Sequence, residues 1–92
     1  MYLIRSTSQF RKSLKRHRHS GRFDQKGLQR VVDTLAAGKV LDEIYRDHEL
    51  TAELAGNREC HIRPDLLLIY RIENNKLVLV LVNLGSHSDL FD

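Results

Sequence analysis

Three of the five histidines lie where the sequence predicts that a strand ends or a loop begins. His48 is in a segment without a regular apolar period, His61 is near the end of a short strand, and His87 follows the last apolar run. An imidazole ionises near neutral pH and can therefore accept or donate a proton there. Loops carried on a rigid sheet are where catalytic groups gather. The three positions therefore indicate acid–base chemistry.

A carboxylate accompanies His61, because Asp65 follows Pro64 and a tight turn would bring the two side chains together. Two other uses of these histidines stay open. In a zinc site, neutral imidazoles would bind the metal, with Asp65 as a ligand or as the partner of one. No histidine pair has the i, i+4 spacing of a helical site, and Cys60 would point away from His61 in a strand. Alternatively, the histidines are structural and bonded to the backbone.

RNA is a substrate for which acid–base groups are sufficient without a metal or another cofactor. A base removes the proton of a ribose 2′-OH, the oxygen attacks the adjacent phosphate, and an acid protonates the departing 5′ oxygen. Cations or hydrogen-bond donors stabilise the charge that develops on the phosphate. Two histidines and an arginine would be enough, with an aspartate orienting one imidazole.

The N-terminal third of the chain is strongly basic, although the net charge of the whole is only +3. Residues 1–30 carry nine Lys/Arg and one acid, whereas residues 31–92 carry six Lys/Arg and eleven acids. A basic region favours a polyanion as partner, through counterion release from phosphates. A solvated helix face or a surface for an acidic protein is the alternative. His17 and His19 are expected to be partly exposed in this region and to add positive charge.

The length and composition predict one globular domain over residues 1–92, with 41% hydrophobic residues. The longest apolar run, residues 77–82, is too short to cross a membrane. Arg5 lies close behind Met1 with no apolar stretch after it, so we expect no signal peptide and a cytoplasmic protein. The single Cys60 cannot form an internal disulfide.

The apolar pattern predicts a strand over residues 2–4, a helix capped within residues 6–8 and a second helix from Asp24 to a stop at Gly38. Residues 39–56 have no clean period and are expected to be an irregular connection. Strands are expected over residues 59–63, 66–72 and 77–84, with a hairpin turn at residues 74–75. The last two are nearly all apolar and should be central. This order predicts an α+β domain in which a strand and helix hairpin pack on a largely antiparallel sheet.

Four segments together carry a resemblance to a known family. They are YRDHEL at residues 45–50, RECHIRPD at 58–65, IYR at 69–71 and GSHSDLF at 85–91. In order and spacing they resemble the YafQ branch of the RelE-type toxins. The resemblance implies a RelE-like fold and an endoribonuclease that cleaves mRNA in the ribosomal A site. It also implies a cognate antitoxin as partner, with operator DNA bound only through that antitoxin.

Carried over position by position, the resemblance implies that His48, His61, Asp65 and His87 are catalytic. His87 is the candidate for the general acid, and His48 or His61 with Asp65 for the base. Phe91 matches an aromatic residue that stacks on a base. The residues expected to bind mRNA or ribosomal RNA are Asn83, Phe91, Arg58, Arg63, Lys12, Lys15 and Arg16.

The sequence departs from the family pattern at two positions. Asn83 stands where the family usually has an arginine that neutralises the phosphate, and Arg58, Arg63 or Arg71 would have to replace its charge. Leu66 stands where the family has a tryptophan. Two rival functions therefore stay open: a RelE-like protein that binds RNA or the ribosome with weak or lost cleavage, and a ParE-type gyrase inhibitor. The histidine set counts against the second.

Overall fold

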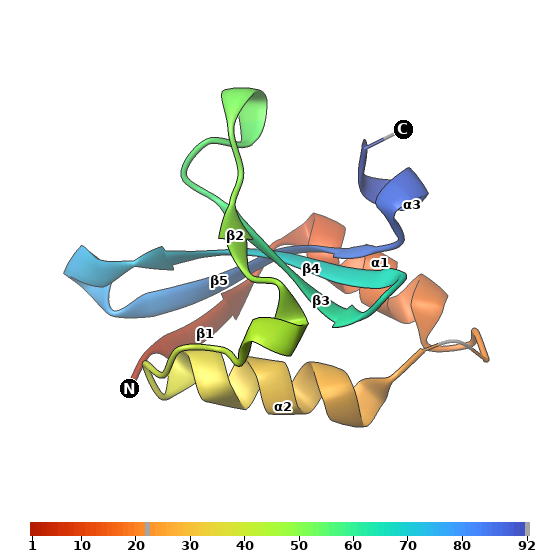
Figure 1. Cartoon of the computed structure of the whole chain (residues 1–92), viewed down its shortest axis with the longest axis horizontal. Coiled ribbons are helices and arrows are strands. Elements are labelled where there is room, and N and C mark those ends of the chain that lie inside the picture. The colour runs from red at the N-terminus through yellow and green to blue at the C-terminus, as the bar shows by residue number, and fades with distance from the viewer. Residues whose placement is uncertain (22, 92) are drawn as a thin grey trace.

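The computed structural model describes residues 1–21 and 23–91, in which helices pack on a five-stranded sheet (Figure 1). The elements are β1 (Leu3–Ser6), α1 (Ser8–His17), α2 (Gln25–Ala36), η1 (Glu43–Tyr45), β2 (His48–Glu49), η2 (Ala52–Leu54), β3 (Arg58–Arg63), β4 (Leu66–Glu73), η3 (Asn74–Lys76), β5 (Val78–Gly85) and α3 (His87–Phe91). The strand order is β1-β5-β4-β3-β2, and only the β1–β5 pair is parallel. The expected α+β architecture with a largely antiparallel sheet is confirmed, and its two most apolar strands are interior.

Both long helices begin at side chains that bond to the free N–H groups of the first turn. The Thr7 hydroxyl accepts from the Phe10 N–H, and the Asp24 carboxylate accepts from the Gly27 N–H. Gly38 follows the end of α2 with φ +77°, a left-handed conformation that glycine adopts without strain. α1 packs chiefly against β5 and α2 against β3.

One face of the sheet forms the core with these helices. Strand alternation places Cys60 and Ile62 of β3 on this face, together with residues from β4 and β5, and they pack against Phe10 of α1 and the apolar stripe of α2. Burial raises the pKa of Cys60 to about 12, so the thiol stays protonated. Alternation directs Glu59 and His61 to the opposite face.

The loop that carries η2 and the short α3 both project on the side of the sheet away from α2 (Figure 1). Neither β2 nor α3 was expected from the sequence. β2 has only two residues, too few for a pattern, and it lies inside the segment expected to be irregular. α3 has five residues and depends on a local capping arrangement described below. No helix among the described residues is long and apolar enough to span a membrane.

Candidate active site

The sheet register aligns the candidate residues in two rows. His48 pairs with Glu59, Glu59 with Ile69, and Ile69 with Asn83, so one row crosses four strands. In the adjacent row Leu67 pairs with both His61 and Gly85. Directly opposed residues project on the same face of a sheet. The register therefore brings His48, Glu59, His61 and Asn83 to the face away from the core, and α3 with His87 starts two residues after Gly85.

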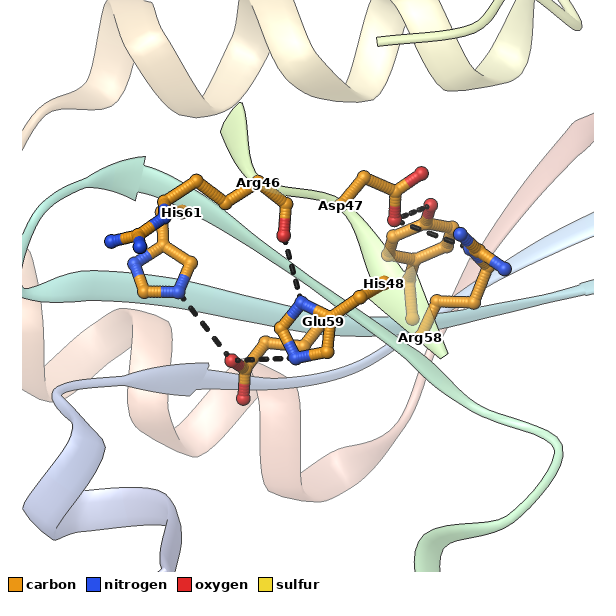
Figure 2. A network of polar contacts seen from close by, with 7 residues as sticks. Arg46, Asp47, His48, Arg58, Glu59 and His61 are labelled. Atoms are coloured by element: carbon orange, nitrogen blue, oxygen red, sulfur yellow. Dashed lines mark hydrogen bonds and ion pairs between the residues drawn. The ribbon is translucent and has the colours of Figure 1, made fainter. Parts of the chain in front are cut away.

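Glu59 joins two of the predicted histidines (Figure 2). Its Oε1 lies 3.5 Å from His48 Nε2 and 3.6 Å from His61 Nε2, and its side chain is only 6% exposed. These distances are longer than an ordinary hydrogen bond. Glu59 Oε2 and His61 Nδ1 are buried and have no partner among the described residues. Buried polar atoms are usually paired, so these two atoms are exceptions that mark the site.

Glu59 is not among the site residues predicted from the sequence, although a signal is present there. In a strand Glu59 and His61 are two residues apart and point to the same face, whereas Cys60 between them points to the core. A carboxylate in a strand on the same side as a candidate catalytic histidine could have been identified from this alternation alone.

His48 is held by the two residues that precede it in the sequence. Its Nδ1 lies 2.8 Å from the Arg46 carbonyl oxygen, which can only accept, so Nδ1 carries a proton. The neighbouring Asp47 accepts a 2.6 Å hydrogen bond from the buried Tyr70 hydroxyl and a 3.2 Å bond from Arg58 Nε. Burial and the hydrogen bond to Asp47 raise the pKa of Tyr70. The contacts of Asp47 with Tyr70 and Arg58 thus fix the start of the short β2 to the sheet.

Asp65 does not join this cluster. It is exposed, and no hydrogen bond or ion pair links it to His61 within the described part of the chain. Pro64 lines the concavity next to His61, whereas Asp65 lines a neighbouring concavity with Ser86, Asp89 and other residues. The Pro64 turn therefore separates the two side chains, and the expected approach of Asp65 to His61 does not occur.

A reciprocal pair of hydrogen bonds starts α3. The Ser86 N–H donates to Asp89 at 3.0 Å, and the Asp89 N–H donates to the Ser86 hydroxyl at 3.1 Å. The bond from the Ser86 N–H lowers the pKa of Asp89. Asp89 also lies 3.3 Å from His17, whose side chain is only 19% exposed. His17, expected to be partly exposed and to add positive charge, therefore links α1 to α3.

His87 and Phe91 form one unit at the exposed end of the chain. Their ring centroids are 5.0 Å apart at an interplanar angle of 42°, within the range of aromatic contacts. Phe91 is still 39% exposed, which leaves part of its ring free for a ligand.

Asn83 is tied into the protein through its amide oxygen. This oxygen accepts from the Ser13 hydroxyl at 2.7 Å and from the Leu84 N–H at 2.8 Å. No described residue accepts from its amide nitrogen, which remains a donor without charge. Leu66 is buried in the core and offers no stacking surface.

The arginines considered as replacements for a charge at Asn83 differ in how far carboxylates neutralise them. Arg58 contacts Asp47 and Glu49, at 3.2 and 3.4 Å. Arg71 contacts Glu73 at 3.2 Å. Arg63 is largely exposed, and its contact with Asp24 is 3.7 Å long. Three cations of α1 are exposed, namely Lys12, Lys15 and Arg16.

The donor types of a metal site are present, but their arrangement does not fit one. Two imidazoles and a carboxylate suit a transition metal. Here both ring nitrogens face Glu59 Oε1, so the three side chains do not surround a shared empty point. Across residues 1–21 and 23–91, no group of three or more His, Cys, Asp or Glu side chains is placed to hold a metal ion.

Residues 2–92 match the family model described as the bacterial toxin of type II toxin-antitoxin systems, YafQ. The chain belongs to the YafQ toxin family. A 51-residue segment is 35% identical to the mRNA interferase toxin YafQ of Escherichia coli (strain B / BL21-DE3). This alignment covers 55% of the chain and 53% of that relative, so the chain spans about half the length of the curated relative it matches.

Solved structures match over the whole chain. A metal-bound toxin from Helicobacter pylori has a TM-score of 0.91 at 46% identity, covering 99% of this chain and 100% of that one. YafQ in the E. coli DinJ–YafQ complex has a TM-score of 0.88 at 28% identity, covering 100% of both chains. The expected RelE-like fold is therefore confirmed.

Proposed function

We propose that this protein is a ribosome-dependent mRNA endoribonuclease, the toxin of a toxin-antitoxin pair, and that it uses histidine acid–base chemistry without a metal. The observation that carries the proposal is the His48–Glu59–His61 cluster on the face of the sheet away from the core (Figure 2). The sheet register aligns this cluster with Asn83 and with the start of α3. The YafQ family match and the name of the E. coli relative support the same activity.

His48 is the general base of this proposal. The Arg46 carbonyl holds the proton on Nδ1, which leaves Nε2 as the nitrogen that accepts a proton. The Glu59 carboxylate lies 3.5 Å from Nε2, and its negative charge stabilises the positive charge that the ring gains. Glu59 thereby takes the role that the sequence suggested for Asp65, and it lies almost equally close to the other ring, 3.6 Å from His61 Nε2.

His87 is the general acid. Nε2 of His48 removes the proton of the 2′-OH, the 2′ oxygen forms a bond to phosphorus, and the bond from phosphorus to the 5′ oxygen breaks as His87 protonates that oxygen. The products are a 2′,3′-cyclic phosphate and a 5′-OH. The Asn83 amide and His61 donate hydrogen bonds to the phosphate oxygens. Phe91, in contact with His87, stacks on a base of the message.

The partners follow from charge and from the relatives. The exposed cations Lys12, Lys15 and Arg16 bind ribosomal RNA and position the protein, while the histidines act on the message. A cognate antitoxin silences the toxin, as the DinJ–YafQ complex supports, and operator DNA is contacted only through it. The action is cytoplasmic, where ribosomes translate.

The test is to incubate the purified protein with translating ribosomes and to map mRNA 5′ ends. New 5′ ends that need both ribosomes and the intact His48 are expected. Protein stripped with EDTA and freed of the chelator should cleave as well as untreated protein, and rescue by added zinc would reject the metal-free mechanism. Ribosome binding with intact mRNA would support the binding-only rival. Inhibition of gyrase with intact mRNA would support the ParE-type rival.

A further inference from the structure

A cavity of about 400 Å³ lies beside His61, at the edge of β3. β2 pairs with β3 only through Glu59 and Arg58, so the rest of this edge is not covered by β2. α2 and η1 form the other walls. Side chains from all three elements line the cavity, among them Arg30, Tyr45, Arg46, His61 and Arg63. Small-ligand sites start near ~300 Å³, so the space suits one nucleotide unit.

The cavity carries excess positive charge. Asp24 is the only acid among the described residues that line it, and it caps α2 and contacts Arg63 at 3.7 Å. Within the described residues no carboxylate forms an ion pair with Arg30 or Arg46. Two guanidinium groups are therefore uncompensated in one concave surface, which favours an anionic ligand.

Arg46 connects this cavity to the proposed catalytic groups. Its backbone is left-handed, with φ 52°, and its carbonyl oxygen is the partner of His48 Nδ1. Its side chain extends toward the His61 ring, which lines the same cavity (Figure 2). One residue thus orients His48 through its backbone and places a cation next to His61 through its side chain.

We propose that this cavity is a subsite for the RNA nucleotide adjoining the cleaved bond, with the Arg46 guanidinium bound to its phosphate. This inference rests on the proposed function and adds to it one contact between Arg46 and the RNA substrate. A guanidinium matches phosphate oxygens in a bidentate way. Arg30 and Arg63 extend the cationic wall, and the half-buried Tyr45 ring offers a stacking surface for the base.

The experiment measures binding of a fluorescent single-stranded RNA that carries 2′-O-methyl groups and cannot be cleaved. Anisotropy is recorded over a salt series for wild type, Arg46→Gln, Arg46→Lys and Arg30→Gln. Lys76→Gln, an exposed cation on the η3 turn, is the matched control. Arg46→Gln should weaken binding about tenfold and flatten the slope of log K against log salt by ~0.7, the loss of one phosphate contact. Arg46→Lys should keep the slope, and Lys76→Gln should match wild type.

Three results would overturn the inference. The first is an Arg46→Gln slope equal to that of Lys76→Gln. The second is no RNA binding by the wild type at low salt. The third is an Arg46→Gln variant that loses affinity for an antitoxin peptide but not for RNA. Should Arg46→Gln fail to fold, Arg30→Gln on a separate element tests the same cavity. Ribosome-dependent cleavage by the wild type is scored separately, so the subsite can fail while the proposed function stands.

Discussion

Replacing Tyr70 with Phe should destabilise the protein by removing a single hydroxyl. This hydroxyl donates a 2.6 Å hydrogen bond to Asp47, and the Tyr70 side chain is 1% exposed. A hydrogen bond to a charged group contributes ~1.5–3 kcal/mol. Asp47 keeps its bond to Arg58 and some contact with water, so we expect the lower part of that range, about 1.5–2 kcal/mol. For a domain of this size ~1 kcal/mol corresponds to ~4–8 °C, which gives a melting temperature lower by about 6–16 °C.

The assay is thermal and urea unfolding of the variant beside a matched control. Tyr45→Phe is that control, because Tyr45 is half-buried and no described residue bonds to its hydroxyl. Tyr70→Phe should also slow mRNA cleavage at temperatures where it is folded, since Asp47 anchors the strand that carries His48. If Tyr70→Phe and Tyr45→Phe unfold at the same midpoint, the hydroxyl does not anchor β2 and the reasoning is wrong.

Three further outcomes are expected. His87→Ala should lower the cleavage rate ~10²–10⁴-fold with an unchanged melting temperature; equal growth arrest by wild type and variant would reject the acid role. Replacing Lys12, Lys15 and Arg16 with Gln should weaken ribosome binding and flatten its salt dependence. An unchanged slope of affinity against salt would mean that these three cations do not bind ribosomal RNA. The lowered pKa of Asp89 means that its carboxylate stabilises the fold at neutral pH and that this stabilisation disappears as the pH falls through that pKa. Unfolding curves of Asp89→Asn should therefore lack this loss of stability at acidic pH.

The larger elements were predictable because each has a local signal that tertiary packing reinforces. The Asp24 cap and the Gly38 stop delimit α2 by backbone chemistry that is visible in the sequence. The β4 and β5 strands are apolar because helices and neighbouring strands bury them. The two-residue β2 has no such signal, since only pairing with β3 and the buried contact of Asp47 with Tyr70 hold it in place.

Only part of the site was predictable, because some of its contacts depend on strand pairing and not on a local signal in the sequence. The sequence indicated His48 and His61, but the carboxylate between them depends on register. Glu59 faces both rings because it pairs with His48 on the neighbouring strand and lies two residues before His61 on β3. Asp65 is close to His61 in sequence, yet the Pro64 turn directs it to a different concavity. Closeness in sequence thus predicted the carboxylate partner of His61 less well than the alternation of side chains along β3 does.

The most direct test of the central claim is a translation reaction on mRNA that carries a 2′-deoxy sugar at the nucleotide 5′ to the mapped cleavage site. The proposed chemistry needs the 2′-OH as its nucleophile and His48 as its base. Cleavage at that position should therefore disappear, while the same message with ribose there is cut to a 2′,3′-cyclic phosphate. Equal cleavage of the deoxy and ribose messages would contradict the account.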